Sequence, residues 1–230
     1  MNILDRGCVL FSFDDGHRSI WDNARDIFAG SGVAATAFVS QEQTMKDPNA
    51  MTVEQLKNLE HSYGWDICSH TNTHVKLPFV EDDTKLETEF LFNIEWMKDN
   101  GFGFLDVVAY PWGLADDRVK TMARRYHTHG RICMHNSRMF ETIPFADSLA
   151  MTARPFSFEH NHVETMPALE SIRPGNVLII YAHWCQAEPN RMACPPDELR
   201  SYIQQIKGAG LNIVTFSGLL AAIKTSGGMQ

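Results

Sequence analysis

Short hydrophobic runs alternate along the chain with longer stretches in which apolar residues recur at helical spacing. The runs predict buried strands at residues 8–13, 33–39, 63–68, 107–110, 176–182 and 211–216. The helical spacing predicts helices at residues 19–29, 85–100, 116–126, 197–208 and 217–224, and one that begins after Thr52. Because strands and helices alternate, and the strands are continuous apolar runs, the pattern indicates a parallel sheet covered by helices.

The clarity of this pattern varies along the chain. Thr52 followed by Gln55 matches a capping box, in which each side chain satisfies a backbone N–H of the first helical turn. By contrast, the stretch from Arg131 to Pro174 is mixed in composition and interrupted by prolines. We assign no regular element to that stretch.

Composition narrows the class of protein. The chain has 230 residues, of which 44% are hydrophobic and 21% charged, which suits one globular domain of barrel size. The formal net charge is −8 and no run of Lys or Arg occurs, so neither nucleic acid nor an anionic membrane is an expected partner. No apolar run is long enough to span a membrane. The oligomeric state is left open.

The cysteines and the first residues bear on the cellular compartment. The five cysteines are scattered and form no C-x-x-C pair, which favours buried free thiols in a reducing compartment. Cys185 and Cys194 are near enough in sequence to pair if the protein is exported. Residues 1–6 lack the apolar segment of a signal peptide. We therefore expect a cytoplasmic protein, or a secreted or envelope protein if a leader has been trimmed from this chain.

Polar clusters follow the predicted strands at the points where the strands end. Asp14 and Asp15 follow the first strand, and His70 and His74 follow the third. Tyr110-Pro111-Trp112 and His183-Trp184 follow two later strands. In a βα barrel, the carboxyl ends of the strands meet at one face, where active sites are built. The sequence thus predicts that these four segments converge.

His70 and His74 are candidate metal ligands. Four residues apart, both imidazoles can reach one ion at about 2.0–2.1 Å if the segment forms a helical turn. The alternative is two surface histidines in a polar loop. Two rival pairs occur, His127 with His129 and His160 with His162, and we interpret both as loop histidines because neither follows an apolar run.

Asp14 and Asp15 allow two interpretations. Taken alone, adjacent aspartates before Gly16 are typical of a turn or a helix N-cap. In a hydrolase, one carboxylate would bind the metal and the other would act as general base. His183 is then a candidate general acid, although a lone histidine after a buried strand is more often a core residue. Trp112 and Trp184 could stack on a sugar ring or pack at the barrel rim.

Together these segments resemble the polysaccharide deacetylase family, carbohydrate esterase family 4, from about Cys8 to Leu220. Ser12–Gly16 is similar to the first family motif, S-F-D-D-G or T-F-D-D-G. Ser69–His74 is similar to the second motif, in which both histidines bind the metal, and Leu178–His183 is similar to the last. The resemblance implies one catalytic domain over residues 1–230, a distorted α/β barrel of about seven parallel strands.

The resemblance also implies roles for individual residues. Asp14 would be the base, Asp15, His70 and His74 would bind a divalent metal, and His183 would be the acid. Zinc is the expected metal, with cobalt, nickel and manganese as alternatives. Backbone donors from Tyr110 and its neighbours Pro111 and Trp112 would hold the oxyanion, and Trp184 would contact substrate.

Two family features are missing from the chain. The motif R-x-P-Y-G or R-x-P-F-G appears here as Ala109–Gly113, without the arginine that orients the base. In some branches an arginine later in the chain replaces it, and Arg154 is our candidate. The motif D-x-x-D-W, which supports the acid, is not visible.

The expected activity is removal of an acetyl group, most simply an N-acetyl group from an amino-sugar saccharide or glycan precursor. An O-acetyl esterase and a hydrolase of small cyclic amides or imides are alternatives on the same fold. A non-catalytic sugar-binding barrel is the third alternative. The presence of Asp14 and His183 argues against it, because a binding module needs no acid and base.

Overall fold

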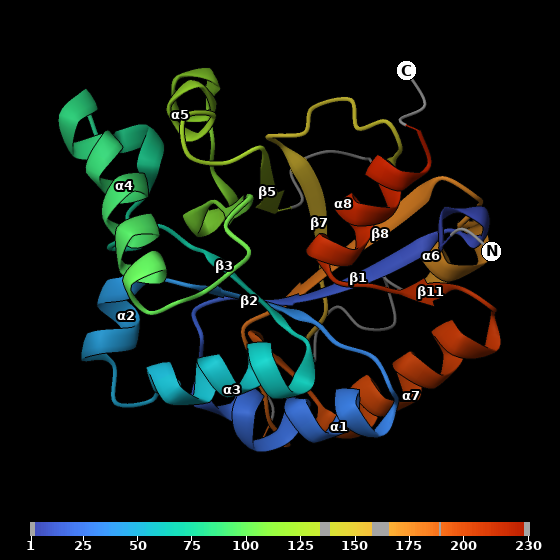
Figure 1. The fold of residues 1–230 in the computed structure, drawn as a ribbon. Helices are drawn as coiled ribbons and strands as arrows, with labels where there is room; N and C mark the ends of the chain where they lie inside the picture. Colours follow the sequence, from blue (N-terminus) through green and yellow to red (C-terminus); the bar gives the residue numbers. More distant parts are fainter. Residues whose placement is uncertain (1–2, 134–138, 158–165, 189, 228–230) are drawn as a thin grey trace.

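The computed structural model describes residues 3–133, 139–157, 166–188 and 190–227. Seven parallel strands close into a barrel, because the last of them pairs with the first (Figure 1). In order around the barrel they are β1 Cys8–Phe13, β2 Thr36–Val39, β3 Asp66–Ser69, β4 Val107–Ala109, β5 His129–Cys133, β7 Met151–Pro155 and β8 Asn176–Ala182. The predicted α/β barrel is confirmed.

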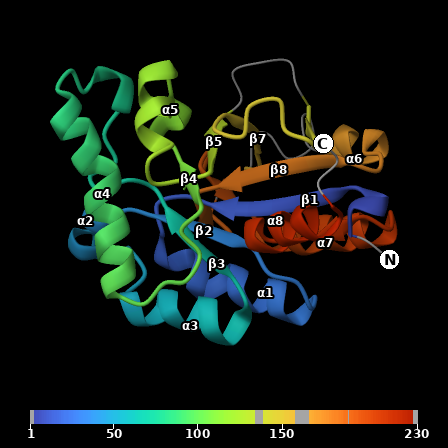
Figure 2. The ribbon, with the colours of Figure 1, turned by 45° about the horizontal axis from the view of Figure 1, so that its top comes forward.

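The barrel is distorted where β1 meets its neighbours. β8 runs alongside β1 over its whole length, with the arrowheads pointing the same way (Figure 2). The other edge of β1 is shared between two partners, β11 Asn212–Ile213 over its first half and β2 over its second half. The short strand β6, Glu141–Thr142, lies antiparallel against β8. Of the strand predicted at 211–216, only the two residues of β11 are observed as strand.

Helices surround the barrel in the alternating order that the sequence predicts. A π-helical turn, Ile20–Ala24, leads into α1. The helices are α1 Arg25–Gly30, α2 Gln41–Lys46, α3 Val53–Tyr63, α4 Asp83–Asp99, α5 Asp117–Ala123, α6 Met166–Ser171, α7 Pro196–Gly208 and α8 Phe216–Thr225. The capping box of Thr52 and Gln55 is present at the start of α3. Helix α2 was not expected, because five of its six residues are polar and it shows no apolar stripe.

The stretch from Arg131 to Pro174 contains further elements that the sequence pattern did not predict, namely most of β5 and all of β6, β7 and α6. The two barrel strands β5 and β7 pair with each other and with the confirmed strands β4 and β8. Their residues include Gly130, Arg131 and Arg154, which break the apolar run. These strands exist because their neighbours pair with them, which local propensity does not report.

Side chains alternate between two apolar layers along each strand. On β1, Val9, Phe11 and Phe13 belong to the outer cluster, which includes residues of α1, α3 and α7. Cys8 and Leu10 face the other way and pack with residues such as Phe216 of α8 inside the barrel. This alternation decides which polar side chains at the strand ends point toward the barrel axis.

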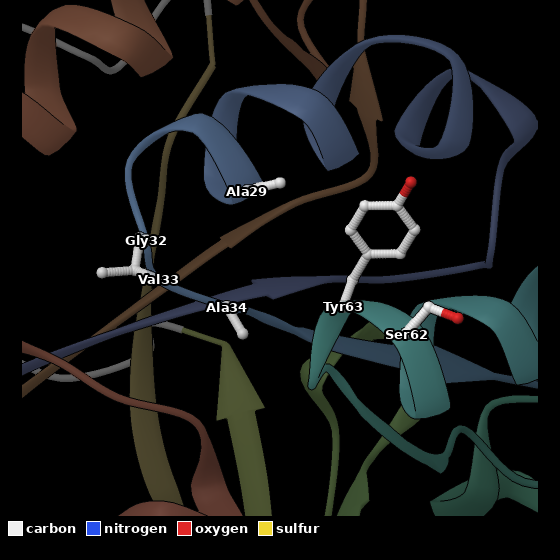
Figure 3. A pocket seen from close by; sticks show the side chains of 6 residues that line it. All are labelled: Ala29, Gly32, Val33, Ala34, Ser62 and Tyr63. Atoms are coloured by element: carbon white, nitrogen blue, oxygen red, sulfur yellow. The ribbon is translucent and has the colours of Figure 1, made fainter.

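Two pockets lie away from the polar strand ends. A depression of about 370 Å³ lies between the ends of α1 and α3 and is lined by residues including Val33 and Tyr63 (Figure 3). A second pocket, of about 300 Å³, is lined mainly by apolar side chains such as Phe145 and Leu220. Within the described residues, no helix is both long and apolar enough to cross a membrane.

Candidate active site

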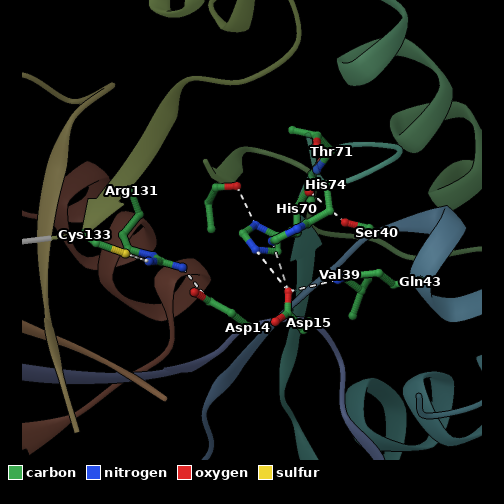
Figure 4. A network of polar contacts seen from close by, with 12 residues as sticks. Asp14, Asp15, Val39, Ser40, Gln43, His70, Thr71, His74, Arg131 and Cys133 are labelled. Atoms are coloured by element: carbon green, nitrogen blue, oxygen red, sulfur yellow. Dashed lines mark hydrogen bonds and ion pairs between the residues drawn. The ribbon is translucent and has the colours of Figure 1, made fainter. Parts of the chain in front are cut away.

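Asp15, His70 and His74 meet at the carboxyl end of the barrel strands (Figure 4). The Asp15 Oδ1 atom lies 3.6 Å from Nε2 of His70 and 3.2 Å from Nε2 of His74. Asp15 comes from the turn after β1, and both histidines come from the loop after β3. The structure therefore brings together the three side chains that the sequence proposed as ligands, with one potential ligand atom each within 4.8 Å of the others.

The tautomer of His70 is set by its surroundings. Its Nδ1 atom lies 2.7 Å from the Ala109 carbonyl oxygen, which can only accept a hydrogen bond. The proton is therefore on Nδ1, and the unprotonated Nε2 faces Asp15. Burial lowers the pKa of His70 to about 4 and that of His74 also to about 4, so both rings are neutral at pH 7. Neutral imidazole is the form that binds metals.

This arrangement fits a divalent cation. A carboxylate oxygen and the lone pair of an imidazole nitrogen face each other with no proton between them, which is unfavourable unless a cation lies there. Two histidines and one carboxylate, with room left for water or substrate, form a common ligand set of catalytic zinc. Gln43 of α2 donates a hydrogen bond to the same Asp15 oxygen at 3.2 Å and helps to orient the carboxylate.

Helix α4 braces the loop that carries the two histidines. The buried Glu89 carboxylate accepts hydrogen bonds from the Thr73 N–H at 2.9 Å and from the Thr73 hydroxyl at 2.5 Å. The Asn93 side chain donates to Ser69 Oγ and to the Val39 carbonyl oxygen. These contacts fix the backbone on both sides of His70.

The backbone is strained at this site. Among the described residues, the non-glycine residues with positive φ are Asp15, Thr71, His74 and Trp112. The left-handed region is tolerated by Asp but is unfavourable for a β-branched residue such as Thr71 or a bulky one such as Trp112. Such strain persists where the surrounding contacts over-determine the geometry, and it clusters at functional sites.

Asp14 lies beside the three ligands but is held by a different partner. It is 3% exposed, and its Oδ1 accepts a hydrogen bond of 2.5 Å from the Arg131 guanidinium. Burial alone would raise the pKa of Asp14, but Arg131, with smaller contributions from His70 and His183, outweighs burial and lowers it. Asp14 is thus a carboxylate at neutral pH.

Arg131 is fully buried in the barrel interior. Its guanidinium carbon lies 5.2 Å from the centre of the Phe38 ring and 5.3 Å from that of Tyr181. The same side chain contacts Cys133 Sγ at 3.4 Å. Since a buried guanidinium is costly without a counter-ion, Asp14 and Arg131 stabilise each other's charged forms.

The sequence also matches a known protein family. The polysaccharide deacetylase family model matches residues 2–130, which is more than half of the 230 residues. The chain belongs to the polysaccharide deacetylase family. The resemblance seen in the motifs is thereby confirmed. No curated protein matches the sequence.

Solved structures with the same fold include members of this family. The peptidoglycan deacetylase PdaC of Bacillus subtilis, in a mutant form, has a TM-score of 0.64 and 14% identity, covering 97% of this chain and 94% of that one. A family 4 carbohydrate esterase from Streptomyces lividans has a TM-score of 0.61 and 13% identity, covering 91% of each chain. A family pseudoenzyme from Bacillus anthracis scores 0.64 at 12% identity, covering 94% of this chain and 66% of that one.

The arginine on the base differs from the one that the sequence analysis favoured. The family arginine would stand at Ala109, and Arg154 was our replacement. The arginine that bonds Asp14 is instead Arg131 on β5. Arg154 follows Ala153, which faces the barrel interior, and precedes Phe156 of the outer cluster by two residues. The alternation along β7 therefore directs Arg154 away from Asp14.

The backbone N–H of Tyr110 does not fit the oxyanion role that the sequence predicted for it. The Tyr110 N–H donates to the Arg131 carbonyl oxygen at 3.0 Å within the β4–β5 pairing, so it is not free for an oxyanion. Pro111 has no N–H to offer. Trp112, next in the chain, lies in the first turn of a short 3₁₀ helix, Pro111–Gly113, where N–H groups lack intrahelical partners. The Trp112 N–H is therefore the available donor of the three.

His183 lies near enough to Asp14, His70 and His74 to contribute to the lowered pKa of each. It directly follows β8, and its ring centre lies 5.8 Å from that of Tyr181. Within the described residues, no side-chain hydrogen bond to the His183 imidazole is found, in line with the missing D-x-x-D-W motif. Trp184 lies next to it with its ring 5.3 Å from that of His17.

The rival histidines do not form a second site in the described part of the chain. His127 is buried, and its Nδ1 lies 2.9 Å from the Leu105 carbonyl oxygen. His129 contacts the Thr128 hydroxyl at 2.8 Å. His160 and His162 lie outside the described residues.

Several residues of the site were missed from sequence. Arg131 carried one usable signal, a lone arginine between Gly130 and Ile132 in a β-prone run. Glu89 also carried one, since it is a glutamate on the apolar side of an amphipathic helix, one residue before Phe90. Gln43 carried none, because glutamine is common on any short polar helix.

Proposed function

We propose that this chain is a divalent-metal-dependent deacetylase that removes an N-acetyl group from an amino-sugar saccharide. One observation carries the proposal: a complete ligand cluster of Asp15, His70 and His74 lies beside a carboxylate, Asp14, that is bonded to arginine. A sugar-binding barrel would need neither the strained cluster nor a buried, ionised carboxylate. Family membership adds support, but the fold also occurs in a protein described as a pseudoenzyme, so the residues themselves must make the argument.

The two carboxylates divide the work. Asp15, His70 and His74 would hold the metal, which when bound supplies a Lewis acid for the acetyl carbonyl and acidifies the attacking water. Asp14 takes the proton from that water, because its carboxylate is ionised at neutral pH and its low pKa is maintained by Arg131. Arg131 also fixes the direction of the carboxylate, since the guanidinium occupies one of its oxygens.

The remaining groups act on the substrate. As the carbonyl carbon becomes tetrahedral, its oxygen gains negative charge, and the Trp112 N–H is placed to donate a hydrogen bond to it. His183, in its protonated form, gives its proton to the leaving nitrogen as the carbon–nitrogen bond breaks. An amine needs this proton because its anion is a poor leaving group. The products are acetate and a free amino sugar.

Aromatic side chains at the rim favour a saccharide. The Trp112 ring is 59% exposed and lies 5.9 Å from the His74 ring, so it borders the ligand cluster. Lys76 places its ammonium 4.6 Å from the centre of the same ring. Exposed tryptophans beside a polar site are suited to stacking on sugar rings. Structures of the same fold are described as acting on peptidoglycan and as carbohydrate esterases.

The proposal is tested with three substrates: an N-acetylchitooligosaccharide and acetylated xylan, whose hydrolysis is measured as released acetate, and a small cyclic imide, whose hydrolysis is measured as ring opening. The chain is first freed of metal with a chelator and then reloaded with zinc, cobalt, nickel or manganese. We expect acetate from the N-acetylated oligosaccharide only in the loaded protein. Acetate from xylan alone would assign an O-acetyl esterase instead, and imide hydrolysis alone would assign the cyclic-amide class. Tight metal binding with no turnover on any of the three would overturn the enzyme assignment.

A further inference from the structure

Two cysteines lie opposite each other beside the proposed acid. Strand β9, Trp184–Cys185, directly follows His183 and pairs in parallel with β10, Ala193–Cys194. In this two-stranded ladder Cys185 is the register partner of Cys194. Both are free thiols and both are fully buried in the outer cluster.

The register places the two thiols in a geometry that a disulfide accepts. Neighbouring strands lie about 4.8 Å apart, and register partners project to the same face of the ladder. That spacing falls within the Cα separation of about 4.4–6.8 Å found across disulfides. Direct interaction with the Cys185 thiol, together with burial, raises the pKa of the Cys194 thiol, in agreement with this register.

The other cysteines are not paired in this way. Cys8 and Cys68 both belong to the interior cluster, but they lie on β1 and β3, which are separated by β2. Cys133 contacts Arg131. Of the five thiols, only those of Cys185 and Cys194 thus lie opposite each other on paired strands.

We propose that Cys185 and Cys194 are a redox pair that closes into a disulfide under oxidising conditions and clamps the segment carrying His183 and Trp184. The thiolate of one cysteine attacks a low-molecular-weight disulfide such as oxidised glutathione, and one glutathione thiol leaves. The second cysteine then attacks the mixed disulfide, and a second glutathione thiol leaves. In sum, the protein loses two hydrogen atoms, and one glutathione disulfide is reduced to two thiols.

The surrounding contacts explain why the clamp matters. The backbone N–H groups of His183 and Trp184 both donate to the Met192 carbonyl oxygen, at 3.1 and 3.3 Å. The Cys185 N–H donates to Ser19 Oγ, and the Cys185 carbonyl oxygen accepts from Asn23. The β9 side of the ladder is thus anchored on Ser19 and on Asn23 of the π-helical turn. A covalent bond between Cys185 and Cys194 would tie Met192, and with it His183, to that anchor.

Opening of the ladder limits the reaction, because both thiols are buried. Between the two strands, the connecting residues Ala187, Glu188 and Arg191 are exposed. Since the thiolate is the nucleophile and few thiols are ionised at neutral pH, oxidation should be faster at about pH 8.5 than at pH 7.

The test uses the full chain incubated with oxidised glutathione or with dithiothreitol, then unfolded and alkylated without further reduction. We expect five alkylated cysteines after dithiothreitol and three after glutathione disulfide, with a peptide cross-link between Cys185 and Cys194. C68S is the matched control and should still form the cross-link, whereas C185S and C194S should not. Five alkylated cysteines, or stable glutathione adducts without a cross-link, would overturn the inference.

A second readout separates this inference from the proposed function, on which its effect on catalysis rests. Backbone hydrogen exchange at residues 190–194 should slow in the oxidised chain but not in oxidised C185S. If the cross-link forms and exchange slows while no acetylated saccharide is hydrolysed, the deacetylase proposal fails and the redox pair stands. If hydrolysis occurs but exchange is unchanged by oxidation, the clamp fails and the deacetylase proposal stands.

Discussion

The two sides of the barrel mouth are built to different degrees of rigidity. On the ligand side, Asp15, His70 and His74 are reinforced from two helices. Gln43 of α2 bonds the carboxylate, and Glu89 and Asn93 of α4 bond the histidine loop. On the donor side, His183 depends on backbone hydrogen bonds to Met192 and on a ladder of two residues per strand.

This difference matches the chemistry proposed for each side. A metal site tolerates errors of only a few tenths of an ångström, so its ligands need side chains that lock them. A proton donor needs only to reach the leaving atom when substrate is present, and its hydrogen bonds often form only in that complex. Rigidity is thus concentrated where the ion would be held.

The proposed base, Asp14, and the proposed ligand, Asp15, are adjacent in the sequence, which allows the sharpest test. D14N should lower kcat by about 10³-fold or more, because the amide cannot accept a proton, while zinc content is unchanged. D15N should lose the metal, which is measured by elemental analysis of dialysed protein. If D14N lost its metal as readily as D15N, Asp14 would be a ligand and the division between them would be wrong.

The donor side is tested with H183Q. We expect kcat on an unactivated N-acetyl substrate to fall about 10²-fold, with no change in zinc affinity, because the role proposed for His183 is to protonate the leaving nitrogen and not to bind the metal. A substrate with an acidic leaving group, such as a nitrophenyl ester, should lose much less. Equal losses on both substrates would show that His183 acts elsewhere than on the leaving group.

The ligand side is tested with E89Q. The amide cannot accept both hydrogen bonds from Thr73, so the loop loosens and zinc affinity should fall about 10-fold to 100-fold in a chelator competition. Activity should recover at saturating zinc, which a general loss of folding would not allow. E95Q on the exposed side of the same helix is the control and should bind zinc normally.

Arg131 should set the pH at which activity begins. The folded pKa of Asp14 is below its ordinary value, so the carboxylate is active above that pKa and activity is lost as the pH falls through it. In R131K, the lysine keeps a positive charge but cannot bond the Asp14 carboxylate as the guanidinium does. The pKa of Asp14 should therefore rise, and the acidic limb of kcat/KM should move to higher pH. An unchanged limb, in protein whose circular dichroism matches the wild type, would show that Arg131 does not tune the base.

The smallest effect concerns pH and metal affinity. Because the pKa of both His70 and His74 is about 4, protons compete weakly with the metal until the pH approaches that value. Zinc affinity should therefore change little between pH 7 and about pH 5 and should fall at lower pH. A site built from exposed histidines would instead lose zinc affinity below about pH 6.5. A fall that starts near pH 6.5, measured by competition with a chelator of known pH response, would contradict the burial argument.

The same shift makes the metal-free protein sensitive to acid. The folded pKa of each histidine lies below its unfolded value of about 6.5. The unfolded chain therefore binds more protons as the pH falls from about 6.5 to about 4, and the free energy of unfolding falls over that window. Buried His127, with a pKa of about 4, adds to this loss without touching the site.

Local sequence determined the strands β1 to β4, β8 and β11, most of the helices, and the placement of polar residues at strand ends. Asp15, His70 and His74 could be predicted because each belongs to a short motif next to its own strand, and the barrel does the rest by aligning the strand ends. The run at 176–182 matched β8 residue for residue, since a fully buried strand carries a strong local signal.

Tertiary structure alone decided which arginine meets Asp14 and which N–H remains free. Arg131 and Arg154 both lie within short strands that local propensity did not reveal, and only the pairing of β7 with β5 and β8 sets which face each presents. The Tyr110 N–H is used up by a partner twenty-one positions away in the sequence, on β5. Pairing register is non-local, and a shift of one residue reverses every side chain, so no single segment contains that information.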